Sequence, residues 1–189
     1  MLCNSATRKL HMEGLKMGAV RGDEMKARID LLPIDVINEL TLDGTEMNIH
    51  GMLMSLAYWW DGQRDKGLDA ALHAALSELD FEIGKDSQNL GGDYPFAFFP
   101  WAMLAMGEVL AYAPAKGIYD DRNWEKGMKW SRCYNAAQRH LLKAQGGEEL
   151  DPETGLMHLA HAATNMLFLA TYRARGMEKW DDRIAKDPA

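Results

Sequence analysis

Two histidines and an asparagine fall on one side of a helical segment near the end of the chain. His158, His161 and Asn165 recur at intervals of three and four residues, so a helix would line them up. The stretch 155–172 around them carries no formal charge, whereas a helix face in water would carry Lys or Glu. We therefore expect the three side chains to be enclosed, where polar groups need partners.

Imidazole and carboxamide groups in an enclosed place suit metal binding, proton transfer or recognition of a nucleotide base. The alternative is that each histidine only forms hydrogen bonds with neighbouring backbone or carboxylates. For a single histidine we would prefer that alternative. Two histidines and an asparagine in register favour a functional site.

The preceding helical segment ends in Arg139-His140 and is followed by an acidic turn. A short connection makes the two helices antiparallel neighbours, which brings the turn close to the histidines. Carboxylates and histidines together bind Mg²⁺ or Mn²⁺, ions that also bridge phosphate oxygens. We expect Asp151, His158 and Glu149 to be the metal ligands.

The acids of this turn also have structural interpretations. Asp151 precedes Pro152 and would cap a helix that begins there, and Glu153 would lie in its first turn, where acids favour the helix dipole. Glu148 and Glu149 could be solvated loop residues. Both interpretations stay open for each acid.

A rival metal site lies earlier in the chain. Glu78 and Glu82 are one helical turn apart, and Glu108 lies in an otherwise apolar helical segment. Paired acids of this kind hold Mg²⁺ in helical nucleotide pyrophosphohydrolases. Salt bridges to Arg or Lys are the alternative.

The polar loop 121–127 contains one aromatic side chain, Trp124. A nucleotide base could stack on Trp124 while Arg122 or Lys126 meets a phosphate. Alternatively, Trp124 only anchors the loop to the rest of the protein.

The elements that must position these residues are helical, and the pattern predicts an all-α fold, a helical bundle. Helices are predicted where apolar residues recur with a helical period or where capping and breaking residues bound a segment. A short helix is predicted after Pro33. The longer predicted helices span 46–60, 68–83, 100–112, 131–145 and 151–175. We expect one helical domain over 28–175, a flexible segment 1–27 and a frayed tail 176–189.

A faint internal repeat suggests that the bundle is built from two pseudo-repeated helical hairpins. Gly67-Leu68 and His73-Ala74-Ala75 align without gaps on Gly155-Leu156 and His161-Ala162-Ala163. Two alanine-rich helices could also match this well by chance.

Composition narrows the classes of partner. The net charge of −7 disfavours a nucleic acid polymer as partner, although a single nucleotide could still bind in a local basic pocket.

The chain has two cysteines far apart and no apolar signal segment, so a reducing compartment is expected. No membrane span is expected, because 155–172 contains polar side chains that hydrocarbon would penalise. Apolar surface around Trp59-Trp60 and Phe96, Phe98 and Phe99 favours a homo-oligomer.

Two stretches of the chain resemble a known protein family. The run DRNWEKGMKWSRCYNAAQRHLLKAQGGEELDPETGLMHLAHAATNMLFL (121–169), together with RIDLLP (28–33), resembles the N-terminal domain of the phage-type dATP/dGTP diphosphohydrolase family. Segment 41–99 has no counterpart in shorter relatives and is expected to be an insertion. Where the family usually has the motif Lys-Tyr-Gly, this chain has Lys116-Gly117-Ile118-Tyr119. Positions that match the family pattern are Asn123, Trp124, Arg139, His140, Glu149, Asp151, His158, His161 and Asn165.

The resemblance implies hydrolysis of a small-molecule nucleotide, dATP or dGTP, with a divalent metal, Mg²⁺ or Mn²⁺, in the cytoplasm of an infected host cell. The expected catalytic residues are His140, His161 and Glu149. The expected nucleotide contacts are Asn123, Trp124, Arg139, Asn165 and Lys116. Two other readings are a non-catalytic protein that sequesters a nucleotide in the same pocket, and a structural or interaction protein whose histidines only pack.

Overall fold

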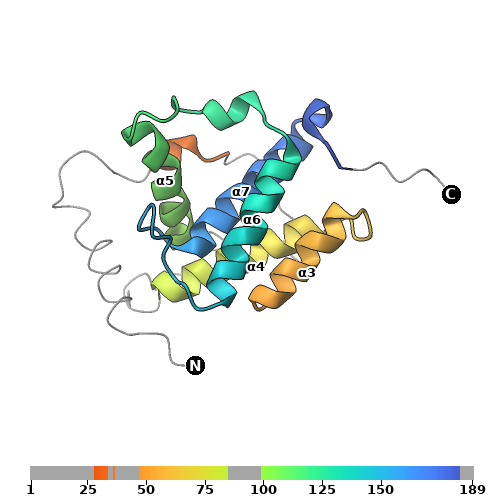
Figure 1. Cartoon of the computed structure of the whole chain (residues 1–189), viewed down its shortest axis with the longest axis horizontal. Helices are drawn as coiled ribbons and strands as arrows, with labels where there is room; N and C mark the ends of the chain where they lie inside the picture. The colour runs from red at the N-terminus through yellow and green to blue at the C-terminus, as the bar shows by residue number, and fades with distance from the viewer. Residues whose placement is uncertain (1–27, 34–35, 37–46, 85–98, 184–189) are drawn as a thin grey trace.

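The computed structural model of the chain describes residues 28–33, 36, 47–84 and 99–183 (Figure 1). Helices account for most of these residues, and the described part contains no β-strand beyond an isolated bridge between Leu150 and Met157. The all-α prediction is therefore confirmed. The α-helices are α3 (Ile49–Trp60), α4 (Gly67–Gly84), α5 (Pro100–Ala115), α6 (Trp130–Gln145) and α7 (His158–Ala174).

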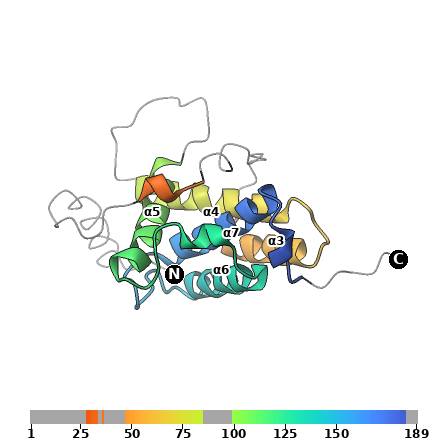
Figure 2. The same ribbon diagram turned by 90° about the horizontal axis from the view of Figure 1, so that it is seen from above.

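Helix α7 forms the centre of the fold. It packs against α4, α5 and α6, and in both views it runs through the middle of the molecule (Figures 1 and 2). Most α7 side chains are buried, including those of His158, His161 and Tyr172. A helix that is covered on all sides has no face that needs charged residues. This confirms the expectation that the histidine-bearing side is enclosed.

The first two long helices form a tight hairpin at the point where α4 begins. A Cβ atom on Gly67 would lie 2.3 Å from the backbone oxygen of Ser55, so only glycine allows this approach of α4 to α3. Further along, Asp80 of α4 accepts hydrogen bonds from the backbone N–H groups of Trp101 and Ala102. It thereby satisfies two of the free donors at the start of α5.

The C-terminal part of the described chain packs back onto the bundle. Residues 176–183 include a short 3₁₀ helix, η4 (Glu178–Trp180), and Asp182 accepts hydrogen bonds from the backbone N–H and hydroxyl of Ser131. The guanidinium of Arg183 lies over the rings of Trp59 and Trp130, 4.6 and 4.8 Å from their centroids. We had expected 176–189 to be frayed; 176–183 make these contacts, and 184–189 lie outside the described residues.

The predicted start of the last helix at Asp151-Pro152 was wrong, because α7 begins at His158. The backbone N–H of Asp151 donates to the Leu156 carbonyl, and the N–H of Gly155 donates back to the Asp151 carbonyl. Gly155 adopts a φ of 72°, a conformation that suits glycine. These bonds close a turn over 151–156, so Asp151 caps no helix.

Two other helix boundaries differ from prediction. Helix α5 continues through Pro114 to Ala115 instead of stopping before the proline. Helix α6 starts at Trp130, and the cap position is Lys129, whose side chain makes no capping bond. The hydroxyl of Ser131, the residue at the predicted start of this helix, donates a hydrogen bond to Asp182.

The structure does not confirm the pseudo-repeated hairpins. Gly67 opens α4, whereas its counterpart Gly155 lies in the turn before α7. Around the expected oligomer surface, Trp59 is buried and stacks on Trp130, while Phe96 and Phe98 lie outside the described residues. The segments predicted as a flexible N-terminus (1–27) and part of the expected insertion also lie outside them. No helix in the described ranges is long and apolar enough to cross a membrane.

Candidate functional site

Three histidines from two neighbouring helices come together where α6 ends and α7 begins. We call His140, His158 and His161 the histidine cluster. The Nδ1 atoms of His140 and His158 lie 2.8 Å apart, at hydrogen-bond distance. The rings of His140 and His161 stack, with centroids 4.6 Å apart and planes 13° from parallel. The antiparallel arrangement predicted for these helices therefore does bring their histidines together.

The acidic turn 146–153 contributes a carboxylate to one side of the histidine cluster. Oε1 of Glu148 lies 3.3 Å from Nε2 of His158, at ion-pair distance but without the alignment of a hydrogen bond. Lys143 of α6 donates a 2.8 Å hydrogen bond to the other oxygen of Glu148. This bond from Lys143, followed by the contact with His158, holds the pKa of Glu148 below its ordinary value.

A second carboxylate reaches His161 through a threonine. The Thr154 hydroxyl donates to Oδ2 of Asp151 over 3.1 Å and lies 2.8 Å from Nε2 of His161. A hydroxyl has one proton, which Asp151 receives, so His161 must carry the proton on Nε2 and donate it to Thr154. The carboxylate itself lies 3.6 Å from the ring nitrogen. Asp151 thus fixes the orientation of His161.

The imidazole rings of His140 and His161 are electrically neutral near pH 7. Burial, and then the charges of neighbouring groups, lower the pKa of His140 to about 4; burial likewise lowers the pKa of His161 to about 4. Partial burial acts to raise the pKa of Asp151, but hydrogen bonds from the Glu153 N–H and the Thr154 hydroxyl outweigh it and the pKa is lowered. Neutral imidazoles beside an ionised carboxylate can accept protons.

Arg139 supplies positive charge next to the histidine cluster. Its side chain is exposed, and its charge helps to lower the pKa of both His140 and His161. Arg139 makes no hydrogen bond or ion pair with any residue that the structure describes, which leaves its guanidinium available to an anion. A guanidinium can bind two phosphate oxygens at once.

The remaining predicted nucleotide contacts have different surroundings. Asn165 is half-buried on α7 and donates a hydrogen bond to the backbone oxygen of His161, one turn earlier. Trp124 is only 6% exposed and stacks on Phe168, with centroids 4.7 Å apart. Its carbonyl accepts a hydrogen bond from the buried hydroxyl of Tyr172. These contacts support the interpretation in which Trp124 anchors its loop to α7.

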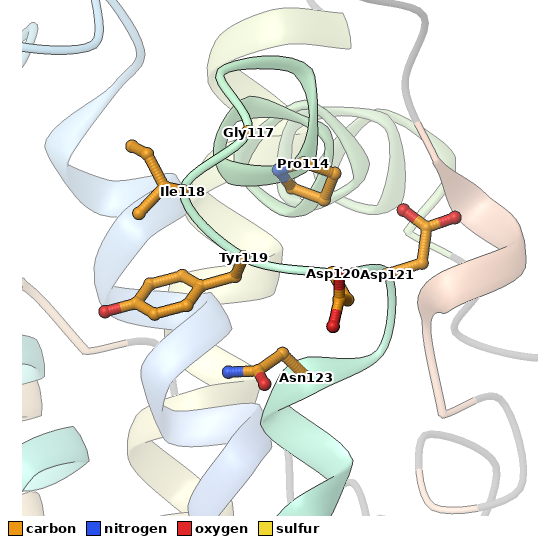
Figure 3. A pocket seen from close by; sticks show the side chains of 7 residues that line it. All are labelled: Pro114, Gly117, Ile118, Tyr119, Asp120, Asp121 and Asn123. Carbon is orange, nitrogen blue, oxygen red and sulfur yellow. The ribbon is translucent and has the colours of Figure 1, made fainter.

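A pocket of about 410 Å³ lies beside this loop, at the end of α5. Figure 3 shows the Tyr119 ring and the Asn123 amide extending to the same side of the loop. Asp121 points away from them and pairs with Arg28. Tyr119 is 54% exposed, so its ring is available for stacking in a way that Trp124 is not. Lys116 caps α5 just before the pocket and is exposed.

The two rival acids whose side chains are described have different surroundings. Glu78 is exposed on α4, while Glu108 is half-buried on α5, where burial raises its pKa to about 7. The side chain of Glu82 lies outside the described part. Over the described ranges, no three His, Cys, Asp or Glu side chains are placed to hold a metal ion, and this includes those of the histidine cluster.

Sequence reasoning missed three residues that shape the site. Glu148 was treated only as one of four acids, although it is the one that faces His158. Lys143 pairs with that acid five residues away, a spacing that crosses the end of α6 and has no helical signature. Thr154 mediates between Asp151 and His161, and a lone threonine in a turn gives no signal of that role.

The histidine cluster lies within the part of the chain that matches a known family. Residues 84–183, just over half of the chain, match the model of a family described as dATP/dGTP diphosphohydrolase, N-terminal. A dATP/dGTP diphosphohydrolase of Salmonella phage PMBT28 is 39% identical over 64 residues, which are 34% of this chain and 21% of the relative. The match therefore spans about a fifth of that relative's length. No solved structure matches the chain.

Proposed function

This chain belongs to the dATP/dGTP diphosphohydrolase N-terminal family, and we propose from this that its histidine cluster hydrolyses purine deoxynucleoside triphosphates. The observation that carries the proposal is the juxtaposition of two neutral, stacked histidines with the guanidinium of Arg139, which has no partner among the described residues. Hydrolysis of a triphosphate requires a group that accepts a proton from water and positive charge that stabilises phosphate oxygens. The phage relative also suggests the host cytoplasm as the place of action.

In the proposed reaction, the oxygen of a water molecule forms a bond to a phosphorus atom of the triphosphate. The anhydride bond on the far side of that phosphorus breaks, and its electron pair leaves with the departing phosphate or pyrophosphate. The proton of the water passes to His140, whose ring is half-buried and uncharged at neutral pH. Arg139 binds the phosphate oxygens on which negative charge develops. His161, held by Thr154 and Asp151, supports the ring of His140 by stacking.

We also propose that a divalent cation, Mg²⁺ or Mn²⁺, binds together with the phosphates of the substrate. Mg²⁺ is usually held by one or two carboxylates together with substrate phosphates, so a set of three protein ligands is not required. Asp151 fits this pattern because its lowered pKa keeps it ionised, and Glu149 is the second candidate. His158 fits less well, because both of its ring nitrogens face protein atoms. When bound, the cation would neutralise phosphate charge.

We place the nucleoside part of the substrate near the pocket beside Asn123. Tyr119 offers an exposed ring for stacking, and the Asn123 amide extends to the same side. The hydroxyl of Tyr112 donates to the Glu153 carbonyl, a bond that ties the end of α5 to the acidic turn of the histidine cluster. This bond fixes the pocket's helix relative to the phosphate-binding side.

Incubation of the purified chain with each deoxynucleoside triphosphate and Mg²⁺ or Mn²⁺ tests the proposal. Products separated by ion-exchange chromatography identify which phosphate bond breaks. We expect dATP or dGTP to be consumed, and His161→Ala, purified in the same way, to be inactive. Binding of nucleotide without turnover would instead support a sequestering protein, and the absence of both would support a structural role for the histidines.

A further inference from the structure

The contact between His140 and His158 holds a single proton. Their Nδ1 atoms lie 2.8 Å apart, and a hydrogen bond between two nitrogens needs one N–H and one bare lone pair. A neutral imidazole carries its proton on only one of its two nitrogens. Which ring donates is therefore decided by the state of the other nitrogen of His158.

That other nitrogen faces a carboxylate. His158 is 3% exposed, and its Nε2 lies 3.3 Å from Oε1 of Glu148 without another partner in the described structure. Lys143 donates to the second carboxylate oxygen and so favours the ionised form of Glu148. A bare lone pair facing this negative charge would be repelled, whereas an N–H is attracted even without ideal alignment. His158 therefore carries its proton on Nε2.

The proton between the rings then belongs to His140. When Nε2 carries the one ring proton of His158, its Nδ1 is a bare acceptor, so His140 must donate from its own Nδ1 across the 2.8 Å contact. Nε2 of His140 is left with its lone pair free. No described residue forms a hydrogen bond with that nitrogen, and the His140 side chain is half-buried.

We infer that Lys143, Glu148 and His158 are positioning residues that hold His140 in the Nδ1–H form, with Nε2 as its proton-accepting atom. The chain Lys143–Glu148–His158–His140 starts at the surface and ends at the histidine cluster, and each link is a contact of 3.3 Å or less. Two of these residues lie on α6, one in the turn and one on α7, so the relay also couples the two helices. The catalytic use of Nε2 rests on the proposed hydrolysis; the proton arrangement does not.

A spectrum of the unliganded full chain tests the proton arrangement without any activity. The histidines are labelled with ¹⁵N, and long-range ¹H–¹⁵N correlations distinguish protonated from bare ring nitrogens, with His140→Gln and His158→Gln providing the assignment. We expect protonated Nδ1 and bare Nε2 on His140, and the reverse on His158. Protonated Nε2 on His140 in the unsubstituted chain would overturn the inference.

Glu148→Gln tests the positioning role, with Glu153→Gln as its matched control. Glu153 is an exposed acid of the same turn whose backbone carbonyl, which substitution leaves intact, makes its contact to Tyr112. An amide at 148 can donate as well as accept, so His158 is free to change form. We expect a mixture of His140 forms in Glu148→Gln and a fall in kcat of about 10- to 100-fold with little change in KM. Glu153→Gln should change neither.

The two proposals fail in different ways. If Glu148→Gln retains the His140 form of the unsubstituted chain, the relay is refuted, whatever the rate of hydrolysis. If the unsubstituted chain hydrolyses no nucleotide, the proposed function fails, while the spectrum of His140 still decides the proton arrangement. Lys143→Arg should retain both the His140 form and kcat, whereas Lys143→Met should shift both toward Glu148→Gln.

Discussion

The imidazole rings of His140 and His161 stack face to face, with centroids 4.6 Å apart and planes 13° from parallel. Two imidazolium cations could not share this arrangement without strong repulsion, and burial penalises each cation further. The stack therefore depends on neutral rings, and it is the feature of the site that should respond most directly to pH.

Acid should destabilise the fold through this stack. The pKa of His161 is about 4 in the folded chain and 6.5 is its ordinary value, so the unfolded chain binds a proton first as the pH falls. Neutral His161 therefore makes its full contribution to the stability of the folded chain above pH ~6.5, and this contribution is lost progressively as the pH falls toward ~4. The full contribution is on the order of 3 kcal/mol at most. Urea unfolding at pH 7.5 and pH 4.5 should show a larger loss for the parent than for His161→Gln.

A matched control separates this effect from general acid sensitivity. His50 is exposed on α3 and is not part of the histidine cluster, and His50→Gln should lose as much stability as the parent between the two pH values. If His161→Gln and His50→Gln lose the same stability between the two pH values, the stack makes no pH-dependent contribution to stability. The conclusion that its rings are neutral would then be wrong.

The general outline of the fold and the grouping of the histidines were both accessible from the sequence. Apolar period and spacing predicted that His158 and His161 share one enclosed face, and the short connection predicted the antiparallel pair of helices that brings His140 against them. Both inferences use geometry that repeats along every helix, which explains why they hold.

The failures lie where a local signal competes with tertiary contacts. Asp151-Pro152 has the pattern of a helix start, but the hydrogen bonds between Asp151, Gly155 and Leu156 close a turn instead. Trp124 in a polar loop could have stacked on a ligand, yet Phe168 of a distant helix covers its ring. Neither outcome is encoded within the segment itself, because each depends on a partner chosen by packing.

His161→Ala should separate function from stability when it is compared with Leu159→Ala. His161 donates one buried hydrogen bond, to Thr154, so its loss should cost roughly 1–3 kcal/mol while nucleotide turnover is abolished. Leu159 is buried in the apolar core, and truncation should cost roughly 2–5 kcal/mol through the cavity it leaves. Turnover and urea unfolding are measured on both. Full turnover in a folded His161→Ala would place the chemistry elsewhere.

Arg139→Met should weaken the use of triphosphate without affecting the fold. The side chain is exposed and has no partner among the described residues, so its loss should change stability by no more than ~0.5 kcal/mol. If the guanidinium binds phosphate, kcat/KM for the triphosphate should fall by roughly 10²–10³-fold. Arg132→Met, an exposed arginine earlier on α6, serves as the control and should leave kcat/KM unchanged.

Glu108→Gln should stabilise the protein at alkaline pH, in the direction opposite to the histidine effect. Burial raises the pKa of Glu108 from 4.5 to about 7, and no described residue forms a hydrogen bond or ion pair with its carboxylate. Between pH ~4.5 and ~7 the folded chain binds the extra proton, so this group lowers stability as the pH rises. At pH 8 the variant should exceed the parent by about 1–3 kcal/mol, and at pH 4 the two should be equal.

The same variant tests whether Glu108 belongs to the rival metal site. A cation bound by Glu108 would compensate its buried charge, so Mg²⁺ at pH 8 should stabilise the parent but not Glu108→Gln. Glu78→Gln removes an exposed acid of the rival set. It should abolish the stabilisation by Mg²⁺, as Glu108→Gln does, only if both acids bind the ion. We expect no stabilisation by Mg²⁺ alone, because no three described His, Cys, Asp or Glu side chains are placed to hold a metal ion. Stabilisation of the parent that both variants abolish would move the metal site from the histidine cluster to α4 and α5.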